Sequence, residues 1–65
     1  MKLAEMKNHY DEDNKLEYIE CNDAVTGEHI FNAVWTEGEE HSLQNKMEHH
    51  RWTIQMLKRA GYEVK

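Results

Sequence analysis

The chain contains no proline, three glycines and one cysteine in 65 residues. The lack of proline and the scarcity of glycine exclude a flexible linker as a description of any long segment. A single cysteine, Cys21, excludes an internal disulfide, and an unpaired thiol is typical of the reducing cytoplasm. No apolar run approaches the ~20 residues of a transmembrane helix. The composition therefore predicts one small cytoplasmic domain, residues 1–65, with no membrane contact.

Basic residues are also scarce in this chain. Eight Lys and Arg residues stand against thirteen Asp and Glu residues, so the formal net charge is −5. Nucleic-acid binding normally requires a basic face that neutralises phosphates, and the sequence contains no cluster of Lys and Arg. This charge balance makes nucleic acid an unexpected partner.

No group of residues matches a catalytic or ligand-binding motif, and a glycine-rich phosphate loop is absent. His49 and His50 point about 100° apart on a helix, and His41 is two turns from His49, so these histidines form no ligand pair at helical spacing. The acidic turn at residues 11–14 lacks the spacing and the closing glutamate of a calcium loop. No helix start lies beside Cys21 to activate its thiol. The sequence therefore predicts no enzyme activity, no catalytic residue, no metal and no cofactor.

A β-hairpin is the clearest local prediction. Residues 15–21 and 28–35 alternate in polarity and are rich in β-branched and aromatic side chains. Between them, the Asp23 side chain can accept hydrogen bonds from downstream amides, and Gly27 supplies the positive φ that such a turn needs. The two segments therefore form antiparallel strands joined by a short turn.

Residues 1–10 fit two interpretations. Leu3, Met6 and Tyr10 recur at helical spacing, whereas alternate residues of the same segment also fit a strand. The polar turn that follows leads directly into the next strand. This order favours a strand that forms a first hairpin.

Pairing Asp23 with Glu28 sets the register of the second hairpin and places Tyr18 opposite Ala33. The other face of the sheet then carries four apolar residues: Ile19, Cys21, Ile30 and Val34. Because one helix covers only one face of a small sheet, this second face predicts an interface, and with it a homodimer.

Residues 36–61 predict one long helix. Thr36 and Glu39 have the spacing of a capping box, and Gly61 fits the left-handed residue beyond the last turn. Two basic residues precede this glycine, at the negative end of the helix dipole. Residues 62–65 either add a short edge strand or extend freely from the helix.

The two faces of this helix differ. Helical spacing places five residues on the stripe that packs on the sheet: Leu43, Met47, His50, Ile54 and Leu57. Trp52 and Met56 lie on the opposite side, with Glu48 and Arg59 as a polar rim. Single exposed apolar side chains are common on protein surfaces. Tryptophan is strongly enriched at binding hot spots, however, so Trp52 beside Met56 predicts a protein interface.

The turn from Asp23 to Gly27 (D-x-x-T-G), the strand that ends at Trp35 and the helix after Thr36 resemble the three-stranded DNA-binding arm domains of phage-type integrases and the plant AP2 domain. The resemblance covers about residues 10–60. It implies a meander of three strands and a helix, with DNA bound by basic residues on the outer sheet face. In this sequence that face would carry Glu17, Ile19, Cys21, Ile30 and Val34, which departs from the basic pattern.

The sequence thus predicts an α+β fold, with a three-stranded antiparallel meander followed by one long C-terminal helix packed on one sheet face. The predicted function is a small acidic, non-catalytic protein–protein interaction module, homodimeric, of a phage or mobile-element type that binds a host protein. A DNA-binding arm-type domain, or a small transcriptional or recombination regulator, is the alternative, followed by a metal-dependent module. The predicted interface residues are Trp52, Met56, Glu48, Arg59, Ile19, Ile30 and Val34.

Overall fold

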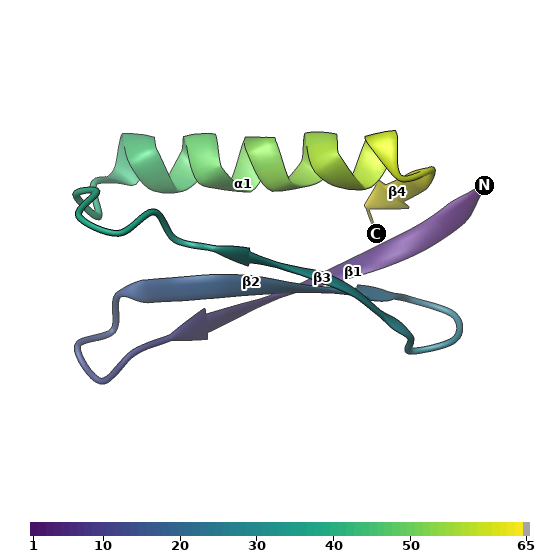
Figure 1. Cartoon of the computed structure of the whole chain (residues 1–65), viewed down its shortest axis with the longest axis horizontal. Coiled ribbons are helices and arrows are strands. Elements are labelled where there is room, and N and C mark those ends of the chain that lie inside the picture. Colours follow the sequence, from purple (N-terminus) through teal and green to yellow (C-terminus); the bar gives the residue numbers. More distant parts are fainter. Residues whose placement is uncertain (65) are drawn as a thin grey trace.

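Residues 1–64 are described by the structure, a computed structural model. In chain order the elements are β1 (Lys2–Tyr10), β2 (Leu16–Asp23), β3 (His29–Val34), α1 (Leu43–Arg59) and β4 (Tyr62–Val64). The strands form one sheet in the order β3-β2-β1-β4, and α1 lies along one side of it (Figure 1). The predicted α+β arrangement is confirmed, and β4 adds the short edge strand, parallel to β1. Lys65, the last residue of the predicted edge segment, lies outside the described residues.

The first hairpin joins β1 to β2 through the acidic turn. The Asp11 carboxylate accepts hydrogen bonds from the backbone amides of Asp13 and Lys15, at 2.8 and 3.0 Å. Asn14 adopts a positive φ of 61°, which asparagine tolerates better than most residues. The strand interpretation of residues 1–10 is therefore confirmed, and the acidic residues at 11–14 serve to close a turn.

The second hairpin has the turn that the sequence predicts. Asp23 accepts hydrogen bonds on Oδ1 from the amides of Val25 and Thr26, at 2.9 and 3.0 Å. Its own amide donates to the carbonyl of Glu28 at 2.8 Å, so the predicted pairing of these two residues is present at the end of the turn. Gly27 has a φ of 78°. Local chemistry therefore determines this turn.

Beyond the turn, the predicted register is wrong by one residue. Tyr18 lies opposite Val34, not Ala33, and Ile19 lies opposite Ala33. Because residues directly opposite each other share a face of the sheet, this shift places Ile19 and Cys21 of β2 on the same face as Ala33 and Phe31 of β3. Ile19 is 1% exposed and belongs to the core beneath α1.

A β-bulge causes the shift. The pairing changes between Cys21 and Asn22, which lie opposite Phe31 and His29, so Ile30 is the additional residue on β3. Cys21 is fully buried and Ile30 packs partly buried against the core. The prediction that Ile19, Cys21 and Ile30 form an uncovered second face is therefore wrong.

The helix begins later than predicted. Its first residue is Leu43, and the Ser42 hydroxyl caps it by accepting the amide of Asn45 at 3.1 Å. Thr36 and Glu39 are joined in a turn through their backbones, with the amide of Glu39 donating to the carbonyl of Thr36 at 3.1 Å. The predicted capping box is therefore not formed.

Two features of residues 36–42 explain the late start. Gly38 has a φ of 84°, a left-handed conformation that interrupts a right-handed helix. The loop also folds around Trp35, whose indole N–H donates to the carbonyl of Glu39 at 3.0 Å and whose ring stacks on His41 with centroids 4.5 Å apart. The end of the helix is as predicted, with Gly61 at a φ of 90°.

The helix is also rotated about its axis relative to the predicted orientation. Leu57 and Thr53 are fully buried, whereas Leu43 and Met47 are 75% and 55% exposed and His50 is exposed. The predicted core position is confirmed for Leu57. For Leu43, Met47 and His50 it is wrong.

Polar contacts hold this rotation. The His49 ring nitrogen Nε2 lies 2.9 Å from the carbonyl oxygen of Ala33, so the ring donates to β3, an edge strand of the sheet. The ring also packs against Trp35, with centroids 5.0 Å apart. The Thr53 hydroxyl donates to the carbonyl of His49 at 2.8 Å. Because this bond satisfies the hydroxyl within the helix, Thr53 can be buried against the sheet.

Candidate functional site

The two flanks of α1 differ in charge and in the strand that they adjoin. The flank over β3 contains Trp52, and we call it the Trp52 surface. It is a shallow depression with a volume of about 270 Å³. Its lining residues are Val34, Thr36, Glu39, Asn45, Glu48, His49 and Trp52.

Trp52 is 48% exposed, and Val34, which also lines the depression, is 66% exposed. The Trp52 ring lies over His49, with centroids 5.9 Å apart and planes 29° apart. Because His49 is itself bonded to Ala33, the tryptophan rests on a fixed support. The sequence places Trp52 and Val34 on separate predicted surfaces, and the structure brings them together.

The other predicted interface residues have mixed positions. Glu48 and Arg59 are exposed on α1, and Met56 is half-buried. Ile19 is buried and Ile30 is partly buried, so neither contributes the open surface that was predicted for them. Trp52, Val34, Glu48 and Arg59 remain available at the surface.

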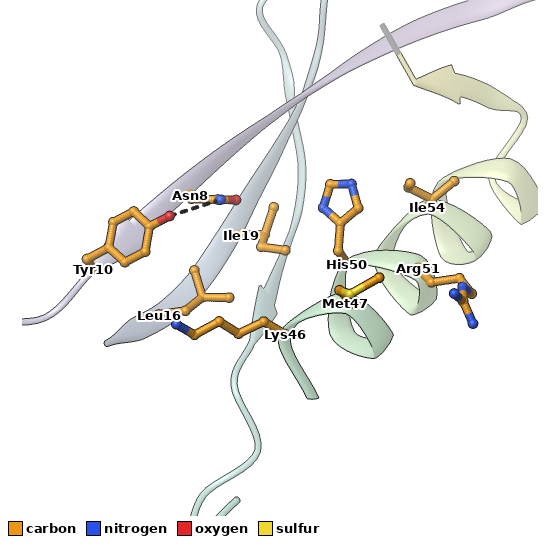
Figure 2. A pocket seen from close by; sticks show the side chains of 9 residues that line it. All are labelled: Asn8, Tyr10, Leu16, Ile19, Lys46, Met47, His50, Arg51 and Ile54. Atoms are coloured by element: carbon orange, nitrogen blue, oxygen red, sulfur yellow. Dashed lines mark hydrogen bonds between the residues drawn. The ribbon is translucent and has the colours of Figure 1, made fainter. Parts of the chain in front are cut away.

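The opposite flank of α1 forms a second hollow, the β1 groove, which the sequence does not predict. Figure 2 shows its lining side chains, which come from the sheet and from α1. Its volume is about 400 Å³. It is lined by Asn8, Tyr10, Leu16, Ile19, Lys46, Met47, His50, Arg51 and Ile54. The helical stripe of Met47, His50 and Ile54 signals this groove in the sequence, but the same stripe also fits a core.

Charge distinguishes the two hollows. The β1 groove has Lys46, His50 and Arg51 among its lining residues and no carboxylate. The Trp52 surface has Glu39 and Glu48 and neither lysine nor arginine. The chain therefore presents a basic apolar groove on one side of its helix and an acidic aromatic surface on the other.

The sheet face opposite α1 is polar. The His9 ring stacks on Tyr18, with centroids 4.4 Å apart, and its Nε2 lies 2.8 Å from Oε1 of Glu20. Hydrogen bonds from Asn22 and His9 lower the pKa of the Glu20 carboxyl, which keeps it ionised on this face. A carboxylate occupies the region where the resemblance implies basic residues that contact DNA.

Cys21 lies in the core and makes a long contact from Sγ to the carbonyl oxygen of Ile19 at 3.9 Å. Burial raises the pKa of its thiol to about 11, and the nearby carboxylate of Glu20 contributes to the increase. The thiol is therefore neutral near pH 7 and is a poor nucleophile.

Two kinds of feature are absent from residues 1–64. No group of three or more His, Cys, Asp or Glu side chains in this part of the chain is arranged to hold a metal ion. Within the same residues, α1 lacks the length and apolar character needed to cross a membrane.

Comparisons of the chain with protein-family models, with curated proteins and with solved structures found no match.

Proposed function

We propose that the chain is a small, non-catalytic protein–protein interaction module that forms a homodimer through the Trp52 surface. The observation that carries this proposal is the adjacency of exposed Trp52 and exposed Val34 in one depression. Tryptophan contributes large contact area and is enriched at the energetic centres of interfaces. Glu48 and Arg59 on the exposed side of α1 supply a polar rim of both charges.

The position of β3 supports self-association. Within residues 1–64, β3 pairs with β2 on one side and with no strand on the other. A free strand edge is a template for pairing with another chain, and two identical edges pair antiparallel about a two-fold axis. A chain of this size also has a small core, so covering Trp52 and Val34 stabilises it further.

The proposal extends to the origin of the protein, its cellular location and its partner. We further propose that it is a phage or mobile-element protein that binds a host protein, a proposal in keeping with its small size and its net charge of −5. The lone, buried Cys21 supports a cytoplasmic location, since secreted domains of this size usually rely on disulfides. The neutral Cys21 thiol and the polar outer sheet face give no support to catalysis or to DNA binding.

Sedimentation equilibrium tests the dimer. We expect a dimer for the wild type and a monomer, still folded by circular dichroism, for Trp52→Ala. Met47→Ala is the matched control, because it removes an exposed apolar side chain from the other flank of the same helix. A wild-type monomer at high concentration, or equal weakening by both substitutions, would contradict the assignment of the interface.

A further inference from the structure

Strand β1 has a free edge along the β1 groove. The parallel partner β4 pairs with Lys2, Leu3 and Ala4, whereas β1 continues to Tyr10. In the described part of the chain, no strand lies beside residues 6–10 on the β4 side. More than half of β1 is therefore paired on one side alone.

The backbone groups at this edge point outward. The carbonyl of Leu3 accepts the amide of Ala24 at 2.8 Å, so Leu3 directs its backbone polar groups toward β2. Alternate residues of a strand direct these groups to opposite sides. Met6 and Asn8 therefore direct their N–H and C=O groups toward the free edge, where an added strand can pair with them.

The open strand position leads into the groove. Strand β4 lies beneath the last turns of α1, and Tyr62 and Val64 pack against the core. From there β1 runs away from the helix toward Tyr10 (Figure 1). A strand in line with β4 would have β1 beside it and Ile54, His50 and Met47 above it. Every second side chain of that strand would enter the groove.

Charge selects among the occupants of this position. Lys46, His50 and Arg51 line the groove without any lining carboxylate, although the chain as a whole has a net charge of −5. A second copy that paired through the same edge would bring two sets of these basic side chains together. A segment with acidic side chains would instead complement them.

We infer that the β1 groove binds an extended acidic segment of another protein, which adds to the β1 edge as a strand in line with β4. Small apolar side chains of the segment fill the groove between Leu16 and Met47, and flanking carboxylates pair with Lys46 and Arg51. This mode is strand addition, in which backbone hydrogen bonds supply affinity and side-chain pockets supply specificity. The inference rests on the proposed role as an interaction module but uses a different surface from the dimer.

A designed peptide tests the inference. The probe is a fluorescein-labelled peptide, Glu-Thr-Val-Thr-Val-Thr-Glu, which as a strand presents two valines flanked by two glutamates on one face. We expect saturable binding by fluorescence anisotropy that weakens as salt is added, because charge pairs are screened. In two-dimensional NMR spectra, the amide signals of Met6 and Asn8 should shift on binding.

Two control peptides separate the contribution of charge pairing to binding from that of backbone hydrogen bonds. Replacing both glutamates by lysines should weaken binding by about tenfold or more, since attraction becomes repulsion. Methylating the backbone nitrogens that face β1 should abolish binding, because those groups can no longer donate to the strand edge. Equal binding of the lysine peptide would overturn the acidic partner, and unchanged binding of the methylated peptide would overturn strand addition.

Protein variants locate the site. The double substitution Lys46→Glu and Arg51→Glu should weaken binding of the probe by about tenfold. The matched control, Lys7→Glu with Lys58→Glu, makes the same charge change on residues that do not line the groove and should leave binding unchanged. Equal weakening by the two pairs would overturn the assigned site.

The outcomes distinguish this inference from the dimer proposal. A stable dimer that fails to bind the probe overturns the acidic-strand inference alone. A monomer that binds the probe overturns the dimer alone. A dimer in which the amides of Met6 and Asn8 are protected from hydrogen exchange, and Trp52→Ala has no effect, shows that a second copy occupies the edge and overturns the inference.

Discussion

His49 of α1 donates from Nε2 to the carbonyl oxygen of Ala33 in β3, across 2.9 Å. This bond ties the helix to the edge strand β3, and the same ring contacts both Trp35 and Trp52. One side chain therefore sets the rotation of α1 and supports the exposed tryptophan of the proposed interface.

Substitutions of His49 and of its neighbour His50 should differ in their effect on the free energy of unfolding. His49→Ala removes the bond to Ala33 and the contact with Trp35, so we expect a loss of about 1–3 kcal/mol in the free energy of unfolding. His50→Ala is the control, because His50 is exposed and should change stability by about 0.5 kcal/mol or less. Urea unfolding measures both, and a larger loss for His50→Ala would contradict the rotation of the helix.

Truncation of two leucines of α1 also tests the rotation of the helix, because one leucine is buried and the other is exposed. Leu57 is fully buried, and Leu57→Ala should cost about 2–5 kcal/mol through lost contacts and a residual cavity. Leu43 is 75% exposed, so Leu43→Ala should stay within about 0.5 kcal/mol of the wild type. Thermal melts followed by circular dichroism rank the two, and similar losses would place Leu43 in the core after all.

The helix start can be tested at its cap. Ser42→Ala removes the acceptor for the amide of Asn45 and should cost about 1 kcal/mol. Thr36→Ala tests the alternative capping box and should cost less, because the turn there uses the backbone carbonyl of Thr36. Chemical denaturation compares them, and a greater cost for Thr36→Ala would favour a helix that begins at residue 36.

Asp23 should contribute to the acid sensitivity of the fold. Hydrogen bonds from the amides of Thr26 and Val25 lower the pKa of its carboxyl in the folded state. A depressed folded-state pKa adds stability above the unfolded value of about 3.9, and this stability is lost as the pH falls through the folded pKa. The melting temperature should therefore fall as the solution is acidified below about pH 4.

The variant Asp23→Asn keeps an oxygen acceptor but does not titrate. It should be less stable than the wild type at neutral pH, and the difference should vanish once the wild-type carboxyl is protonated. Melting temperatures across an acid series measure this convergence. A difference that is constant across the series would show that the charge of Asp23 is not its source.

Elements with their own local chemistry could be predicted from the sequence. The turn at Asp23 forms because the Asp23 carboxylate accepts from the amides of the turn, and the helix ends at Arg59 because Gly61, two residues on, adopts a φ of 90° without strain. The order of three strands and a helix follows from such signals together with alternating polarity, whereas the sequence left open whether residues 62–65 form an edge strand. These interactions involve residues close in sequence, so no distant partner is needed to specify them.

The candidate surfaces depend on two features that only the tertiary structure decides. The bulge at Ile30 moves Ile19 and Cys21 beneath the helix, and a bulge leaves no local signal in the alternation of side chains. The rotation of α1 depends on the His49 and Thr53 hydrogen bonds, which allow polar residues to replace apolar ones at the sheet. Sequence alone therefore determined which elements form and singled out Trp52. Packing between elements decided that Trp52 and Val34 line one depression and that Met47 borders a groove, because burial depends on contacts between residues far apart in the chain.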